Sequence, residues 1–236
     1  MENGGAARKI IFGLILAVGF VAGCWVLGDS LITFRAMDRY VTVKGLAERE
    51  VPADLAMWPV SYSVTANTLI DMDSAIKRDR AQIMAYLKEQ GLGDAEVIDA
   101  TPRIQDMWSI NPDRRPGFRY QANAVLTVRS SDIAKVKKAI AASGNLVARG
   151  VLLVQNYEFR PTFAFTGLNS IKPEMIAEAT RNARDAARQF AADSGSRVGA
   201  IRRATQGYFS LQDRDQLTPE IKSVRVVTTV DYLLED

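Results

Sequence analysis

An uninterrupted apolar stretch lies near the start of the sequence, and alternating or helically periodic patterns follow it. The stretch covers nineteen residues, 10–28, and contains no charged side chain. As a helix it would be about 28 Å long, which is close to the hydrocarbon thickness of a bilayer. The pattern therefore predicts a transmembrane helix at residues 10–28, preceded by a short terminus at 1–9 and followed by a linker at 29–39.

Two basic residues immediately before the apolar stretch predict its orientation. These are Arg8 and Lys9, and positively charged flanks stay on the cytoplasmic side of a membrane. We therefore expect a single-pass protein of the bacterial inner membrane, with residues 1–9 in the cytoplasm and the C-terminal region in the periplasm. Such a protein contacts membrane lipid through residues 10–28.

Two alternatives for the apolar stretch stay open. A cleaved signal peptide is one, although the apolar core of such a peptide is usually shorter, about 7–15 residues. A lipoprotein signal is the other, because residues 21–24 (Val-Ala-Gly-Cys) resemble a lipobox that would leave Cys24 acylated. Apolar residues follow Cys24 at the place where a polar residue is usual, so we favour the retained anchor.

Gly19 and Gly23 form a Gly-x-x-x-Gly pair within the predicted span. Small residues at this spacing let two helix backbones approach closely, so this face is a candidate for helix packing in the membrane. Transmembrane helices are rich in glycine in general. The pair therefore also fits a helix that has no helical partner.

The region after the linker combines strand and helix patterns. At residues 60–67 apolar side chains alternate with polar ones, which is the period of a half-buried strand. The expected elements are strands at 40–51 and 60–67, a helix at 71–90, strands at 96–107 and 118–128, a helix at 131–143, a strand at 151–159, a helix at 173–193, and strands at 197–209 and 222–234. Paired strands between single helices predict one α+β domain over residues 40–236, with mainly antiparallel sheets and packed helices.

The composition limits the chemistry of this region. The hydrophobic fraction is 47% and the charged fraction 24%, as in an ordinary folded protein. The chain has no histidine and a single cysteine, Cys24. The commonest general base is therefore missing, and neither an intrachain disulfide nor a Cys/His zinc site can form. We expect no catalytic residue, no metal and no cofactor.

The carboxylate pairs and basic patches have simple explanations. Asp71 and Asp73 stand where a helix begins, and a capping role explains them. Asp213 and Asp215 lie in a polar stretch that is typical of a solvated loop. The lysines at 135–138 fall on the outer face of a short amphipathic helix. We therefore expect a protein that is not an enzyme and that has no nucleic acid partner.

Three sequence blocks follow one another through the region after the linker. They are Val43-x-Gly45-x-Ala47 with Val51-Pro52-Ala53-Asp54-x-Ala56, then Gly117-x-x-Tyr120-x-Ala122-x-x-x-Leu126-x-Val128, and then Ala183-Arg184-x-x-Ala187 with Gly195-x-x-x-Gly199. Together they resemble the SIMPL-domain family, a group of bacterial envelope proteins. The resemblance implies a periplasmic or surface location, ββα-type units and a tendency to form large ring-like homo-oligomers. It brings no catalytic residues, and a retained anchor departs from members with cleaved signals.

Two loops carry aromatic side chains outside the predicted elements. Trp108 lies in the loop at 107–117, and Phe163 and Phe165 lie in the loop at 160–170. Aromatic residues in exposed loops are enriched at protein interfaces, so these three are candidate contacts between subunits of a homo-oligomer. The alternative is that both loops fold back over the core as lids.

Two functions fit these observations. The first is a non-enzymatic, membrane-anchored envelope protein that self-assembles into a homo-oligomer and serves as a scaffold or a stress-related envelope component. The second is a periplasmic binding module for an envelope peptide, lipid or glycan. The second function requires a deep, apolar-lined pocket, which the first does not need.

Overall fold

The computed structural model describes residues 13, 17–28, 39–110, 112–155 and 157–235. Residues 17–28 form a helix. Within the described part of the chain, no helix is both long enough and apolar enough to cross a membrane. The other residues of the predicted span, 10–12 and 14–16, lie outside the described residues, as do residues 1–9 and residues 29–38 of the predicted linker.

The described chain is an α+β protein with antiparallel sheets, as the sequence predicted, and it divides into two compact units. Unit 1 comprises the residues up to 48, residues 173–209 and the residues from 225 onward, and unit 2 comprises residues 49–172 and 210–224. Strands β1 (Tyr40–Pro52) and β10 (Ile221–Glu235) and helix α6 (Leu168–Asp193) contribute residues to both units.

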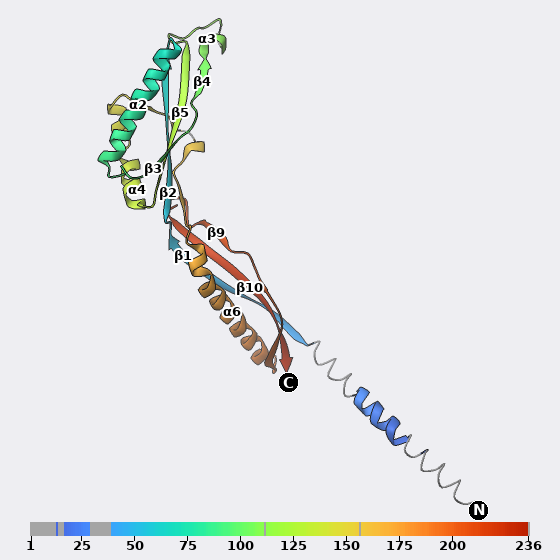
Figure 1. Ribbon diagram of the computed structural model, residues 1–236. Helices are drawn as coiled ribbons and strands as arrows, with labels where there is room; N and C mark the ends of the chain where they lie inside the picture. Colours follow the sequence, from blue (N-terminus) through green and yellow to red (C-terminus); the bar gives the residue numbers. More distant parts are fainter. Residues whose placement is uncertain (1–12, 14–16, 29–38, 111, 156, 236) are drawn as a thin grey trace, which may run out of the picture. The chain divides into compact units, whose positions relative to one another are not determined.

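The sheet of unit 2 is built around one long antiparallel pair of strands (Figure 1). These are β2 (Leu55–Ala66) and β5 (Tyr120–Ser130), and Ala66 lies opposite Tyr120. Four short strands extend the pair: β3 (Glu96–Asp99) and β4 (Arg103–Asp106) on β5, and β6 (Leu152–Leu153) and β7 (Thr162–Ala164) on β2. Alternate residues of β2 and β5 therefore face one core.

Helices α2 (Leu69–Glu89) and α4 (Ile133–Ala141) cover one face of this sheet (Figure 1). Their buried side chains form one cluster with the inward residues of β2 and β5. Tyr86 of α2 is fully buried, and its hydroxyl donates a hydrogen bond of 2.6 Å to the carbonyl of Ala139. Helices α3 (Met107–Ile110) and α5 (Gly144–Ala148) and the 3-10 turn η1 (Tyr157–Phe159) are short.

Several elements differ from their predicted bounds, and three of them show the physical reasons. The strand predicted at 96–107 is the pair β3 and β4, separated by a segment that contains Pro102, which has no N–H to donate to a ladder. The strand predicted at 151–159 is the two-residue β6 followed by η1. The helix predicted from residue 173 begins at Leu168, so Pro173 lies inside α6.

Unit 1 packs α6 against a sheet with the order β1-β10-β8, where β8 is Arg197–Gln206 (Figure 1). Strand β9 (Ser210–Asp213), whose residues belong to unit 2, also pairs with β10. The buried side chains of α6 are four alanines and Met175. A Cβ added to Gly45 of β1 would lie 1.8 Å from the carbonyl oxygen of Ala179. Glycine is therefore required where β1 meets α6, which explains its place in the first sequence block.

Candidate functional site

Helix α2 begins at one end of unit 2, where α3 also lies (Figure 1). Large apolar side chains of these two helices are exposed. Leu69 is 55% exposed, Ile70 is 80% exposed and Ile110 is 56% exposed. We call these three residues, together with Trp108 in α3, the apolar tip. Neighbouring exposed side chains of this size commonly mark an interaction site.

Hydrogen bonds hold the two segments of the apolar tip together. The backbone N–H of Arg119 donates to Oδ1 of Asn67 at 3.1 Å, and the N–H of Met107 donates to the carbonyl of Arg119 at 2.7 Å. Strand β4 also pairs Asp106 with Tyr120, which itself lies opposite the end of β2. The start of α2 and the start of α3 are therefore neighbours in space.

Trp108, one of the predicted subunit contacts, is half-buried and held by its own loop. Its Nε1 donates to the carbonyl of Pro116 at 3.1 Å. The guanidinium carbons of Arg115 and Arg119 lie 5.6 and 5.7 Å from the centre of its ring. Cations at this distance from an indole face are attracted to it. The ring therefore forms a rigid margin of the apolar tip.

Asp106 fixes the geometry at the start of α3. One carboxylate oxygen accepts hydrogen bonds from the N–H groups of Trp108 and Ser109, and the other accepts from the Arg119 side chain at 3.0 and 3.1 Å. The hydrogen bond from Arg119 is the main cause that lowers the pKa of Asp106, and burial acts in the opposite direction. The carboxylate stays charged at neutral pH and keeps the loop in place.

The other two predicted contacts, Phe163 and Phe165, lie at the far end of the long strand pair. Phe163 in β7 is opposite Ala56 of β2 and packs partly buried against the core. Phe165 is half-buried, and its ring would touch a Cβ placed on Gly167. Ten residues of β2 separate Ala56 from the end near Trp108, or about 33 Å at 3.3 Å per residue. The three aromatic residues therefore do not form one surface.

The two glycines of the predicted membrane contact lie in the helix at 17–28. A Cβ built on Gly19 or on Gly23 would meet no atom within 4 Å. Neither glycine therefore contacts another described part of the chain.

Asp54, a member of the first sequence block, accepts hydrogen bonds from the two residues that precede α6. Its carboxylate accepts hydrogen bonds from the N–H of Thr166 at 2.8 and 2.9 Å, from the Thr166 hydroxyl at 3.1 Å, and from the N–H of Gly167 at 2.9 Å. Burial would raise the pKa of Asp54, but these hydrogen bonds together lower it. Asp54 therefore stabilises the start of α6, a structural role.

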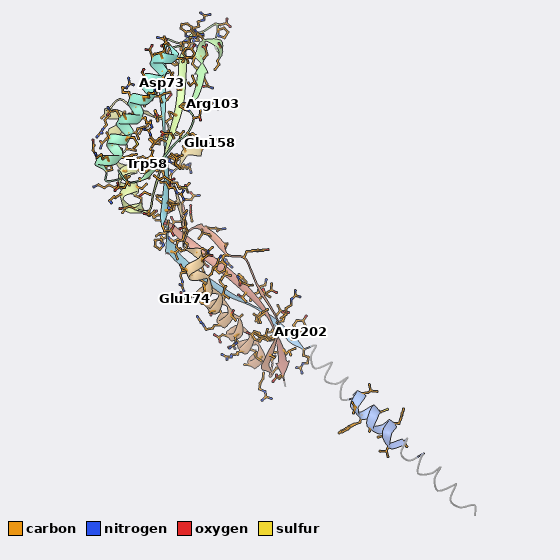
Figure 2. All side chains as sticks on the ribbon, in the orientation of Figure 1. Trp58, Asp73, Arg103, Glu158, Glu174 and Arg202 are labelled. Carbon is orange, nitrogen blue, oxygen red and sulfur yellow. The ribbon has the colours of Figure 1, made fainter. Side chains whose placement is uncertain are left out.

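A cavity of about 350 Å³ lies beside β2 in unit 2. Its walls come from β2, from α4, from the N-cap residue of α5 and from the segment around β6 and η1. The lining residues are Trp58, Pro59, Val60, Ser61, Ile140, Ser143, Leu153, Val154, Gln155, Phe159, Arg160 and Pro161. Trp58, labelled in Figure 2, is almost completely buried. The lining is mainly apolar with a few polar groups, which is the usual character of a ligand pocket.

Pro59 explains why the edge of β2 is open at this cavity. Strand β7 pairs with β2 up to Met57, and β6 pairs with it from Tyr62. Between them lies Pro59, which cannot donate a hydrogen bond to a further strand. Pro59 directly precedes the alternating pattern at residues 60–67. It could have predicted an open strand edge, but the sequence analysis did not use it.

The carboxylate pairs considered for catalysis are held in structural contacts. Thr68 caps α2 and hydrogen bonds with Asp71, while Asp73 pairs with Lys77 on the helix surface. Asp213 pairs with Lys222, and hydrogen bonds from Thr218 and Arg214 lower the pKa of Asp215 to about 2. Among the described residues no group of acidic or cysteine side chains could hold a metal ion.

The apolar tip was not anticipated from the sequence. Leu69 and Ile70 precede the helix predicted at 71–90, so the pattern assigned them to a connection. The signal was Thr68, a preferred N-cap residue followed three positions later by Asp71. A cap at Thr68 places both apolar residues in the exposed first turn.

These observations define the class of the protein. It is an α+β protein in which helices pack on antiparallel sheets, its carboxylate pairs are engaged in hydrogen bonds and ion pairs, and it has an exposed apolar tip. A family model described as "SIMPL: Protein of unknown function (DUF541)" matches residues 41–230. The chain therefore belongs to the SIMPL family, as its three sequence blocks indicated. Curated proteins gave no match to the chain.

Proposed function

We propose that this protein is a non-enzymatic, membrane-anchored envelope component that self-assembles into a homo-oligomer through the apolar tip of unit 2. The observation that carries the proposal is the exposure of Ile70, Leu69 and Ile110 on neighbouring segments. Apolar centres with a charged rim are typical of protein interfaces. Asp71, Arg114 and Arg115 supply such a rim.

A second copy of the chain is the proposed occupant of the apolar tip. The family resemblance favours it, because it implies ring-like homo-oligomers. The rigid loop also favours it, since Asp106, Arg119 and Trp108 fix the surface before any partner binds and so reduce the entropy lost on association.

The anchor is proposed to be residues 10–28, which would gather the copies on the periplasmic face of the inner membrane. The charge-free sequence of this stretch and the basic residues Arg8 and Lys9 support that arrangement. The intact mass of the purified protein separates the two modes of anchoring. A retained helix gives the mass of a chain that still contains residues 10–23, whereas a shorter chain that begins at an acylated Cys24 would indicate a lipoprotein.

The mass of the full chain in detergent, measured by light scattering after size exclusion, tests self-assembly. We expect the wild type to elute as a multiple of the subunit mass and the variant Ile70→Ser/Ile110→Ser to elute as a monomer. Val147→Ser is the matched control, because Val147 is 56% exposed on α5, outside the apolar tip. A monomeric wild type would contradict the proposal, and so would a double variant that stays assembled.

A second candidate function is a binding module for an envelope peptide, lipid or glycan. The cavity beside β2 supports it, since Trp58, Val60 and Ile140 offer apolar contacts and Arg160 offers a charged one. The fluorescent probe anilinonaphthalene sulfonate combines an apolar ring system with an anionic group and is expected to bind there. Ser143→Trp should fill the cavity and abolish this binding, and unchanged probe fluorescence in that variant would exclude the cavity as the site.

A further inference from the structure

Strand β1 forms one edge of the sheet in unit 1. It pairs with β10, and among the described residues no strand lies on its other side. The N–H of Leu234 donates to the carbonyl of Arg39 at one end of the pair, and the N–H of Ala53 donates to the carbonyl of Glu220 at the other end. The same number of residues separates these two contacts on each strand. The register is therefore the same at both ends of the thirteen-residue β1.

Other strand edges of the molecule have features that prevent the addition of a strand. The register of β8 shifts on both sides of Tyr232, and such bulges twist an edge away from a further strand. In unit 2, Pro59 interrupts the edge of β2. Strand β1 has no proline before its last residue, Pro52. A long, regular edge of this kind is a template for a further strand.

The backbone of every second residue in β1 faces away from β10. The carbonyl of Arg39 bonds to β10, and in an antiparallel ladder alternate residues direct their N–H and C=O groups to opposite sides. Residues 40, 42, 44, 46 and 48 therefore direct theirs outward. The side-chain amide of Asn182 donates to the carbonyl of Leu46 at 2.7 Å, which agrees with this direction. A carbonyl oxygen has two lone pairs, so it can also accept a hydrogen bond from an added strand.

The side chains of these outward-facing residues are complementary to a second copy of themselves. Lys44, Leu46 and Glu48 are exposed on the face of the sheet opposite α6. In an antiparallel pair of two β1 strands centred on Leu46, each Lys44 lies opposite Glu48 of the other copy, and the two leucines lie together. Registers centred on Lys44 or Glu48 put like charges opposite each other, and those centred on Gly45 or Ala47 put a charge opposite Leu46. Opposite charges on facing strands are favourable and like charges are not.

We infer that β1 pairs antiparallel with β1 of a second copy, with Leu46 at the two-fold axis, so that the sheet of unit 1 continues from one chain to the next. The inference rests on the proposed self-assembly and adds a second contact to the apolar tip. Because its ion pairs are solvated and weak, the strand contact is expected to form only among copies that the apolar tip already holds together. Two different contacts on each chain allow an assembly larger than a dimer.

The proposed membrane anchors are compatible with this pairing. With Leu46 at the centre, the two copies of Tyr40 lie about 41 Å apart at 3.4 Å per residue. The linker at 29–39 can reach up to about 36 Å when it is extended. The two linkers together can therefore connect both strands to anchors in one bilayer.

Disulfide trapping in the full chain, purified in maltoside detergent, tests the inference. Every variant also carries Cys24→Ser, which makes the introduced cysteine the single thiol. Opposite residues of an antiparallel pair have Cα atoms about 5.5 Å apart, within reach of a disulfide. Leu46→Cys should therefore give a covalent dimer on oxidation. Tyr40→Cys is the matched control, since Tyr40 is 47% exposed on the same strand face and Leu46 is 40% exposed. It should give at least about tenfold less dimer, because its copies lie too far apart.

Charge reversal tests the register. In the Leu46→Cys variant, Lys44→Glu puts like charges opposite each other and should lower the amount of covalent dimer at least about threefold. Lys44→Glu/Glu48→Lys exchanges the two charges and should restore the dimer. Lys88→Glu, an equal change of charge on the exposed side of α2, should leave the dimer unchanged.

The outcomes separate this inference from the proposed function. If the wild type is assembled by light scattering but Leu46→Cys gives no more dimer than Tyr40→Cys, the inference is overturned and assembly through the apolar tip stands. A charge exchange that fails to restore the dimer would also overturn it. A monomeric wild type would instead contradict the proposed function, and the strand contact would fall with it.

Discussion

Each unit packs a helix on antiparallel strands, but the side chains between the helix and the sheet are large in unit 2 and mainly small in unit 1. In unit 2, α2 directs large side chains such as Ile83, Tyr86 and Leu87 into a core shared with β2 and β5. In unit 1, α6 directs mainly alanines toward a sheet whose nearest strand carries Gly45 at the contact. The stability of unit 2 should therefore fall most when a buried side chain is shortened, and the stability of unit 1 should fall most when a side chain at the helix–sheet contact is enlarged.

Leu126→Ala should have the largest effect, and it should act on unit 2. Leu126 is 1% exposed in the main core, and truncation of such a residue costs about 2–5 kcal/mol through lost burial and the cavity left behind. Chemical denaturation measures the free energy of unfolding, and hydrogen exchange locates the change. Faster exchange confined to the amides of β8 and α6 would contradict the assignment of Leu126 to the core of unit 2.

Gly45→Ala should destabilise unit 1 by about 1–3 kcal/mol, because the added methyl group overlaps the carbonyl of Ala179 and forces α6 away. Gly117→Ala is the matched control, since a Cβ there meets no atom within 4 Å. The control should change stability by less than about 0.5 kcal/mol. Equal melting temperatures for the two variants would show that α6 does not approach β1 closely.

Asp54→Asn should lower stability by about 1 kcal/mol at neutral pH, since the start of α6 loses a charged acceptor. The folded-state pKa of Asp54 lies below its ordinary value of 3.8. Its contribution is therefore fully present above that pH and is lost as the pH falls through the lower folded-state pKa. The difference between wild type and variant, followed by thermal denaturation across this range, should shrink at acidic pH. A difference in stability that does not change with pH would show that the negative charge of Asp54 is not the source of its contribution. Asp113→Asn, which changes an exposed aspartate, is the control.

Asp73→Ala should have the smallest effect, about 0.3–0.5 kcal/mol. Asp73, labelled in Figure 2, pairs with Lys77 at 2.6 Å on the exposed side of α2. Because both side chains are solvated, the small loss should disappear in concentrated salt. A salt-independent loss above about 1.5 kcal/mol would mean that the carboxylate has a buried partner.

Local patterns predicted the larger elements well. The alternation at residues 60–67 identified most of β2, and the helical period after residue 71 identified α2 apart from its first turn. Both signals depend on a residue's own neighbours in sequence. The shortness of β6 could not be predicted in this way, because β6 forms only where the distant strand β2 offers an open edge.

The candidate sites were harder to predict because they depend on contacts between distant segments. Trp108 was recognised, but its exposed neighbours Leu69 and Ile70 belong to another segment, which the Asn67–Arg119 hydrogen bond brings close. The division into two units likewise passes through β1, α6 and β10 without a mark in the sequence.

Hydrogen exchange of the full chain at two concentrations, one above and one below the point where the protein associates, tests the central claim most directly. At the higher concentration, slower exchange is expected in the segments at 67–72 and 105–119, with little change in α5. Protection that appears elsewhere while both segments stay unchanged would contradict assembly through the apolar tip.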